Sequence, residues 1–301
     1  MSHSPPQQHQ MTPLAWLLLL LLAMIWGGSF ISNKAALTEI SVFTVVALRV
    51  SGGAALLWAY VLIRRLPLPR DPRFLLRFAI MGLLNNAVPF SLIVWGQQHI
   101  ESSLASILNA SSAVFGVVIA ALVFADEQLT RRKAIGVTLG FTGVVTAIGI
   151  GALTSLDPTA LGQWAVVGAS ITYGIAAAYA RRAITGLRPE VAAAGMLTAA
   201  ALWMLPVMLW QDGIPTFDWA WPTWAGLIWL AFVCSAIAYL LYYRVLALAG
   251  MGNLSLVGLL IPPFAILAGW IAYGERLGWN AVLGFALLAA GLIVLNRRKT
   301  P

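Results

Sequence analysis

The sequence predicts an all-α membrane protein: ten transmembrane helices arranged as two inverted five-helix repeats, with both termini in the cytoplasm. The prediction rests on the composition, on a pattern that occurs twice, and on the placement of the charges. Of the 301 residues, 60% are hydrophobic and 9% charged, whereas soluble domains carry roughly 25% charged residues. A chain with so few charges is expected to cross a lipid bilayer several times.

The apolar residues gather in segments of roughly 18 to 25 residues, the length that crosses a ~30 Å hydrocarbon core as a helix. Helices are expected because, in hydrocarbon, a helix satisfies the backbone hydrogen bonds of its own segment. The ten expected spans are residues 14–32, 42–63, 74–96, 102–124, 133–152, 161–180, 189–210, 223–248, 253–273 and 278–296.

One pattern of residues occurs twice at a constant offset. It consists of a Glu, a Leu two residues later and two glycines seven residues apart: Glu127, Leu129, Gly136 and Gly143, then Glu275, Leu277, Gly284 and Gly291, each 148 residues on. The offset is about half the chain, so we expect a tail over 1–12, a first repeat over 13–152 and a second over 153–298. Five spans per repeat is an odd number, which requires the second repeat to be inverted. Inverted repeats are a recurrent architecture of transporters, with a binding site near the midplane.

The charges alternate from one connection to the next. Basic residues follow every second segment: Arg64, Arg65, Arg70, Arg73 and Arg77; Arg131, Arg132 and Lys133; Arg181, Arg182 and Arg188; Arg244; and Arg297, Arg298 and Lys299. The other connections hold Lys34 and Arg276 beside acidic residues. Because Lys and Arg concentrate in cytoplasmic loops, both termini are placed in the cytoplasm. The net charge of +8 is thus explained by topology, and a nucleic-acid partner is not expected.

Polar and aromatic side chains reach a common depth in four segments. At about 1.5 Å per residue, Trp26, Asn85, Asn86, Tyr173 and Ser235 all lie roughly 16 to 20 Å into the bilayer. Helical spacing adds Asn33 and Tyr239 to these stripes, and Asn109 and Ser112 supply further amide and hydroxyl groups. The set predicts a substrate-binding chamber. The alternative is interhelical hydrogen bonding, which uses the same residue types.

Three further features bear on transport. Arg49 is a charge inside a span, so it either attracts a substrate carboxylate or has a structural role, reaching the surface or pairing with Glu39 or Glu101. Lys34 has the same two interpretations, as a substrate attractor or an interfacial residue. Pro262 and Pro263 are expected to break the ninth span, as a gating hinge or as a static kink.

Motifs for chemistry are missing from the sequence. It contains no HExxH zinc pair, no nucleophile elbow and no phosphate-binding loop. We therefore expect no catalytic residues, no metal and no cofactor, and an enzyme is the least supported class.

Several of these residues resemble the EamA repeat of the drug/metabolite transporter superfamily. The resemblance rests on the stretch from Trp26 to Phe30, on Arg49, on the proline-containing ninth segment followed by Glu275, and on the doubled pattern. It implies a carrier of ten helices in two inverted bundles in the bacterial inner membrane, and members of similar layout export aromatic and other amino acids.

The leading hypothesis is accordingly a monomeric exporter of amino acids, broad and including aromatic and neutral ones, or of similar small metabolites, working by alternating access. None of the ten acidic residues lies in a predicted membrane interior, which favours a facilitative carrier over proton antiport. The alternative within transport is a multidrug or nucleotide-sugar-like carrier, and the alternative class is a non-transporting membrane scaffold or enzyme.

Overall fold

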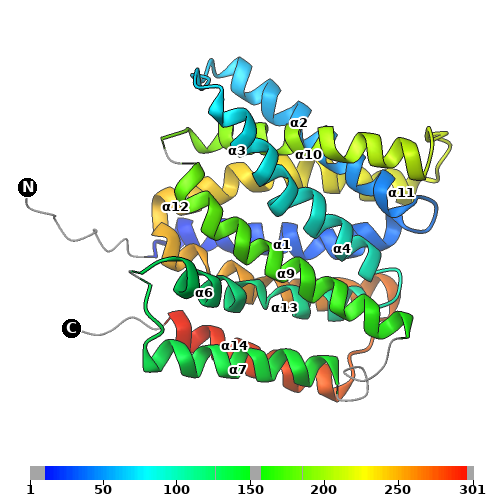
Figure 1. Ribbon diagram of the computed structural model, residues 1–301. Coiled ribbons are helices and arrows are strands. Elements are labelled where there is room, and N and C mark those ends of the chain that lie inside the picture. Colours follow the sequence, from blue (N-terminus) through cyan, green and yellow to red (C-terminus); the bar gives the residue numbers. More distant parts are fainter. Residues whose placement is uncertain (1–10, 126, 150–156, 185, 297–301) are drawn as a thin grey trace, which may run out of the picture.

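The computed structural model describes residues 11–125, 127–149, 157–184 and 186–296, and within these every regular element is a helix (Figure 1). Most of the expected tail 1–12 and the expected boundary between residues 152 and 153 lie outside the described residues. The elements are α1 (Pro13–Ala36), α2 (Val42–Ile63), α3 (Arg73–Gly82), η1 (Leu83–Ala87), α4 (Val88–Gly96), α5 (Ser102–Asn109), α6 (Ser112–Val123), α7 (Arg131–Ile148), α9 (Pro158–Ala183), α10 (Pro189–Gln211), α11 (Trp221–Ile228), η2 (Trp229–Ile237), α12 (Ala238–Leu254), α13 (Val257–Tyr273) and α14 (Trp279–Asn296).

The helices have the lengths and surfaces of membrane-spanning elements. In the part of the chain that the structure describes, seven helical stretches of 22 to 30 residues are long and apolar enough to cross a bilayer, and Val257–Tyr273 and Trp279–Leu295 are shorter apolar helices. Large apolar side chains point outward, among them Leu17, Leu62 and Leu122, which are 64%, 66% and 81% exposed. Exposed apolar surface on this scale is suited to lipid contact.

Two of the long helices contain a π-helical segment near their middle. η1 lies between α3 and α4, and η2 lies between α11 and α12. The repeat offset of 148 carries residues 83–87 onto 231–235, inside η2, so the irregularity occurs at equivalent places. π-helical turns are rare and are frequent at functional sites. Both segments carry polar residues that the sequence placed at the midplane: Asn85 and Asn86 in η1, and Ser235 in η2.

The break predicted at Pro262 and Pro263 is not found there. α13 runs without interruption from Val257 to Tyr273 with both prolines inside it. Two missing backbone N–H groups shorten the hydrogen-bond ladder without ending the helix, because neighbouring groups in a helix bundle compensate. The chain instead departs from helical geometry at Gly250, where φ is 74°, and at the turn formed by residues 255–256. A similar turn at residues 110–111 separates α5 from α6.

Helices from the two halves pack against each other in matched pairs. α7 lies along α14 at one side of the molecule, and α2 lies along α10 toward the opposite side, with α1 and α9 between them (Figure 1). Glycines permit the closest approach: a Cβ at Gly136 would lie 2.9 Å from the carbonyl oxygen of Gly291, and one at Gly143 would lie 2.7 Å from that of Gly284. These glycines therefore serve close helix packing, and the two copies of the doubled pattern contact each other.

The buried side chains form two apolar clusters. One is built largely from α1, α5, α7, α9, α13 and α14, and the other largely from α2, α4, α10 and α11. Tyr173 packs against both clusters, whereas Tyr242 packs against the first and Tyr239 against the second. The seam between the clusters is thus lined by tyrosines, and the polar residues of the candidate site lie beside it.

Candidate functional site

The two asparagines of η1 share one partner from the second half of the chain. Asn85 Nδ2 donates to the hydroxyl of Tyr239 at 3.2 Å, and this hydroxyl donates to Asn86 Oδ1, also at 3.2 Å. Asn86 is fully buried, and its Nδ2 has no partner among the described residues. An amide donor left unpaired in an apolar interior is costly. The asparagine pair therefore has hydrogen-bonding capacity that its neighbours do not use.

Arg49 is 6% exposed and lies close enough to Tyr239, the partner of both asparagines, for electrostatic interaction. Its Nε donates to Ser235 Oγ at 3.3 Å, and its guanidinium carbon lies 3.7 Å from the ring centroid of Phe90. No carboxylate pairs with Arg49 among the residues that the structure describes. Pairing with Glu39 or Glu101, one of the structural roles considered for Arg49, is not found among the described residues; Glu39 instead lies at the start of α11, where it accepts from the backbone N–H of Ala220.

Ser235 and Trp26 tie the site to the helices around it. Ser235 Oγ donates to the carbonyl of Leu230 at 2.8 Å, across a π-helical turn. Trp26 Nε1 donates to the carbonyl of Cys234 at 3.1 Å, and its ring lies 5.9 Å from that of Tyr242. The aromatic face expected from Trp26 thus stands beside the Arg49–Ser235 contact.

Three other expected site residues lie on α5, α6 and α9. Tyr173 is close enough to the Arg49 charge and to Tyr239 for electrostatic interaction. Asn109 ends α5 and Ser112 begins α6, so both border the turn at 110–111, and Asn109 Oδ1 is buried without a partner among the described residues. Ser170 on α9 donates to the carbonyls of Leu108 and Asn109. We define the central network as Arg49, Asn85, Asn86, Ser235 and Tyr239, with Trp26 and Tyr173 beside it.

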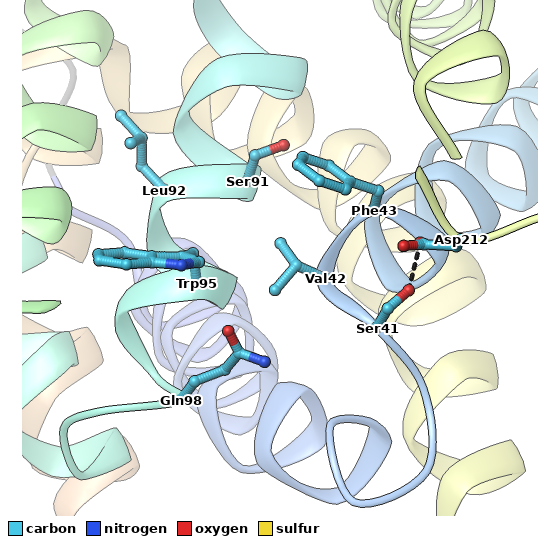
Figure 2. A pocket seen from close by; sticks show the side chains of 8 residues that line it. All are labelled: Ser41, Val42, Phe43, Ser91, Leu92, Trp95, Gln98 and Asp212. Carbon is cyan, nitrogen blue, oxygen red and sulfur yellow. Dashed lines mark hydrogen bonds between the residues drawn. The ribbon is translucent and has the colours of Figure 1, made fainter. Parts of the chain in front are cut away.

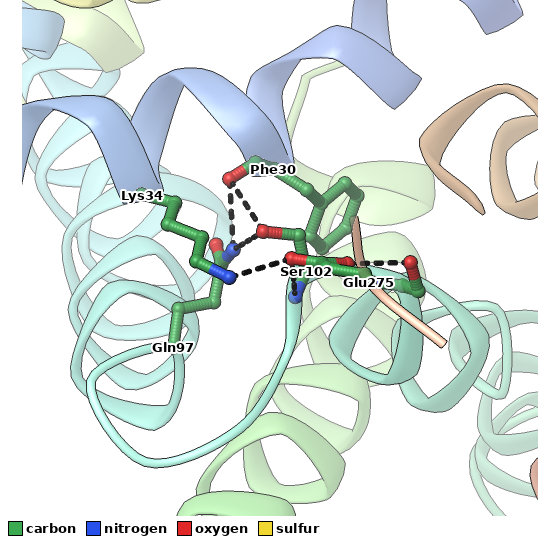
Figure 3. Close-up of polar contacts among 6 residues, drawn as sticks. Phe30, Lys34, Gln97, Ser102 and Glu275 are labelled. Carbon is green, nitrogen blue, oxygen red and sulfur yellow. Dashed lines mark hydrogen bonds and ion pairs between the residues drawn. The ribbon is translucent and has the colours of Figure 1, made fainter. Parts of the chain in front are cut away.

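Asn33 does not join the central network. It is 1% exposed, and its Nδ2 donates to Gln97 Oε1 at 2.8 Å. Gln97 in turn donates to the carbonyl of Phe30 at 2.8 Å and to Ser102 Oγ at 3.1 Å (Figure 3). This second network therefore joins the C-terminal ends of α1 and α4 to the N-terminus of α5. Sequence reasoning missed Gln97, because a single Gln at the end of a predicted span carries no pattern.

Lys34 forms an ion pair with Glu275 at 2.9 Å, with the Glu275 side chain 1% exposed (Figure 3). Glu275 also accepts from the backbone N–H groups of Ser102 at 3.1 Å and Ser103 at 2.9 Å, and from Ser103 Oγ at 2.5 Å. It therefore caps the N-terminus of α5, where a negative charge is favourable. In the sequence, Glu275 was noted as a member of the doubled pattern, and this membership is the signal from which its role as the cap of α5 could have been inferred.

The pKa of Glu275 is set by two opposing effects, burial and hydrogen bonding. Burial by itself raises the pKa, but hydrogen bonds from Ser103, Lys34 and the backbone N–H groups of Ser103 and Ser102 outweigh burial and hold the pKa below its ordinary 4.5. Glu101 behaves in the opposite way, because burial and the charge of Glu275 raise its pKa. Glu275 is therefore ionised at neutral pH.

A pocket of about 360 Å³ lies between the start of α2 and the ends of α4 and α10 (Figure 2). None of the expected site residues lines it. Asp212 at its edge accepts from the backbone N–H of Thr44 at 2.9 Å and also from the Ser41 hydroxyl, so its carboxylate caps α2. The remaining lining residues are Val42, Phe43, Ser91, Leu92, Trp95 and Gln98.

Potential metal ligands do not gather in the described part of the chain: no three His, Cys, Asp or Glu side chains there lie close enough to hold an ion. The functional groups that do come together are amides, hydroxyls, one guanidinium and aromatic rings. Such groups can hydrogen-bond to or stack against a polar solute. Together with the apolar exterior, they describe a membrane protein with a cluster of polar side chains in its interior.

Comparison with known proteins supports the same class, that of membrane transporters. The model of the EamA-like transporter family matches residues 13–149 and 160–297. The chain belongs to this family, and the resemblance found in the sequence is confirmed.

Two relatives that cover nearly the whole chain are named for transport. The "Uncharacterized transporter YoaV" of Bacillus subtilis is 23% identical over 281 residues, covering 92% of this chain and 96% of the relative. A protein of Streptantibioticus cattleyicolor named "Probable terminal-alkyne amino-acid exporter" is 27% identical over 285 residues, covering 93% of this chain and 92% of its own. A solved structure titled "Crystal structure of protein" shares the fold, with a TM-score of 0.68 and 18% identity over 94% of this chain and 96% of that one. These comparisons establish a multi-pass membrane transporter of small metabolites.

Proposed function

We propose that this transporter exports amino acids, including aromatic and neutral ones, or similar small metabolites across the bacterial inner membrane. It works as a facilitative carrier by alternating access, as a monomer of ten transmembrane helices in two inverted repeats. The observation that carries the substrate class is Arg49, a buried cation with no carboxylate partner among the described residues. A buried charge is costly unless it is paired, and a substrate carboxylate supplies the missing partner.

The surroundings of Arg49 suit the rest of an amino acid. The unpaired Asn86 Nδ2 and Asn109 Oδ1 offer a hydrogen-bond donor and an acceptor, and the rings of Trp26 and Tyr173 offer apolar faces and cation–π contact for an ammonium group. Apolar walls separate similar side chains weakly, by about 1 to 3 kcal/mol per methylene. Several amino acids are therefore substrates, and the Streptantibioticus relative named as an amino-acid exporter supports this class.

The inverted arrangement is supported by reciprocal packing. Gly136 approaches Gly291 while Gly143 approaches Gly284, as expected when a twofold axis relates the two copies of a pattern. α1 packs on α13 as α9 packs on α6, and α1 packs on η2 and α12 as α9 packs on η1 and α4. Moreover, the basic connections after α2, α6 and α9 gather at one end of the bundle (Figure 1), the end that the positive-inside rule assigns to the cytoplasm. We call this end the inner face and the opposite end the outer face.

A facilitative mechanism follows from the groups around the central network. Within the described residues, the hydrogen bonds of Arg49, Asn85, Asn86, Ser235 and Tyr239 involve no carboxylate. A proton-coupled exchange needs a group that titrates in the site. The substrate's own gradient is therefore the driving force.

Pro262 and Pro263 remain the proposed hinge. They lie close to the point where α13 contacts Gly27 of α1.

Counterflow in proteoliposomes tests this proposal. Vesicles loaded with an unlabelled amino acid accumulate the labelled form if the protein carries it. Arg49→Met removes the cation and is expected to raise the half-saturating concentration about tenfold or more, since hydrogen bonds to charged groups contribute about 1.5 to 3 kcal/mol. Arg70→Met, at an exposed position between α2 and α3, is the matched control and keeps normal flux.

Three results overturn the proposal. Normal counterflow in folded Arg49→Met excludes the carboxylate anchor. Flux inhibited by lipophilic drugs but by no amino acid favours the multidrug alternative. Absence of flux for every solute in well-folded protein favours a scaffold.

A further inference from the structure

The repeated Glu of each half forms an ion pair with a cation on an equivalent helix. Glu275 follows α13 and pairs with Lys34 in the last turn of α1, at 2.9 Å; Glu127 follows α6 and pairs with Arg181 in the last turn of α9, at 3.5 Å. The repeat offset of 148 carries Lys34 onto Arg182, the neighbour of Arg181 in the same last turn of α9. The two ion pairs therefore join equivalent elements of the two halves.

An aromatic ring accompanies each cation. Lys34 Nζ lies 4.8 Å from the ring centroid of Tyr273, which ends α13, and the guanidinium carbon of Arg181 lies 4.4 Å from that of Phe124, which follows α6. A cation over a ring gains roughly 0.5 to 1 kcal/mol at exposed sites. Because α1 and α9 run in opposite directions (Figure 1), the pair at Glu275 lies at the outer face and the pair at Glu127 at the inner face.

The two copies differ in burial. The side chain of Glu275 is 1% exposed and that of Lys34 32%, whereas those of Glu127 and Arg181 are 38% and 46% exposed. Glu275 is inserted at the N-terminus of α5, while Glu127 also pairs with Lys133 at 2.7 Å. Ion pairs in water contribute little, whereas a desolvated and hydrogen-bonded pair holds its elements firmly. The outer copy is closed and the inner copy is loose.

We propose that these ion pairs are the two latches of alternating access, an inference that rests on the proposed transport function. The outer latch, Lys34–Glu275, holds α1, α5 and α13 together while the inner latch, Arg181–Glu127, is open to water. In the opposite state the two latches exchange roles. Glu127 becomes buried between α6, α9 and the segment 250–251, which the repeat offset of 148 relates to Ser102 and Ser103. Glu275 is then released from the N-terminus of α5. Breaking one latch therefore shifts the population between the two states.

Distances between spin labels on the full chain in nanodiscs, without substrate, test this directly. One label pair, at Thr38 and Arg276, spans the outer face, and another, at Gln128 and Arg188, spans the inner face; all four positions are exposed. Lys34→Met removes the outer cation and is expected to lower the ratio of outer-closed to outer-open protein about threefold to tenfold, with the inner distance shortening. Arg181→Met, its counterpart, shifts the ratio the other way.

Lys34→Arg keeps the charge and is expected to keep the unmodified protein's distances. If Lys34→Met does not fold, Glu275→Gln weakens the same latch and is expected to shift the ratio in the same direction. The inference is overturned if the folded variants leave both distances unchanged, or if Lys34→Met and Arg181→Met shift them in the same direction. Opposite shifts in a protein that carries no amino acid in counterflow would support the latches while refuting the proposed substrates.

Discussion

Replacing Gly143 by Ala tests whether the doubled glycine pattern is the contact that joins the two halves. A Cβ at Gly143 would lie 2.5 Å from the backbone N of Leu288 and 2.7 Å from the carbonyl oxygen of Gly284. Atoms at van der Waals contact are about 3.5 to 4.0 Å apart, so α7 and α14 must separate by about 1 Å. Overpacking of this kind costs about 1 to 3 kcal/mol, against which the better helix propensity of Ala returns about 1 kcal/mol.

Gly143→Ala is therefore expected to destabilise the protein by up to about 2 kcal/mol. The measurement is the free energy of unfolding in mixed micelles, followed by far-UV circular dichroism. The matched control is Gly116→Ala, where a Cβ meets nothing within 4 Å and stability is expected to stay equal or rise by up to about 1 kcal/mol. Equal stability of the two variants would refute the packing argument, and with it the reciprocal contact that supports the inverted repeat.

Three further predictions concern polar groups. Tyr239→Phe removes the hydroxyl shared by the asparagines of η1, so about 1 to 3 kcal/mol of stability is lost; unchanged unfolding would show that the amides pair elsewhere. Because the pKa of Glu275 in the folded protein is held below 4.5, the contribution of this carboxylate to the free energy of unfolding is present above pH 4.5 and is lost as the pH falls through the folded pKa. The prediction is contradicted if the free energy of unfolding falls by the same amount in acid for Glu275→Gln as for the unmodified protein. Asp212→Asn weakens the cap of α2, raising hydrogen exchange in its first turn, whereas unaltered exchange there would exclude the capping role.

The sequence predicted the helices well because hydropathy and charge report directly on bilayer crossing. Within the described residues, helix occupies most of each expected range, and the family was recognised from a handful of residues. Backbone detail was not predictable in this way, since η1, η2 and the turns at 110–111 and 255–256 depend on which carbonyl each N–H reaches. Proline gave a misleading signal in α13, because a helix within a bundle tolerates lost backbone bonds.

The candidate site was predicted in part. Asn85, Asn86, Ser235 and Tyr239 do come together, since residues at one depth on equivalent helices meet when the repeats pack. The environment of Arg49 was not foreseen, because depth along a helix does not show which way a side chain points or which loop carboxylates already have partners. Asn33 was assigned to the same stripe, yet it pairs with Gln97 nearer the outer face. Whether these residues bind a substrate stays a prediction.

Residues 70 and 218 report on whether the site is enclosed by two bundles of opposite orientation. They are 148 residues apart, so they occupy equivalent exposed positions in the two halves. Single cysteines at Arg70→Cys and Asp218→Cys, each with Cys234→Ala, are treated in intact cells with a membrane-impermeant thiol reagent. Labelling is expected at position 218 alone, with position 70 labelled only after the cells are opened. Labelling of both positions from the outside, or of neither, would contradict the inverted repeat.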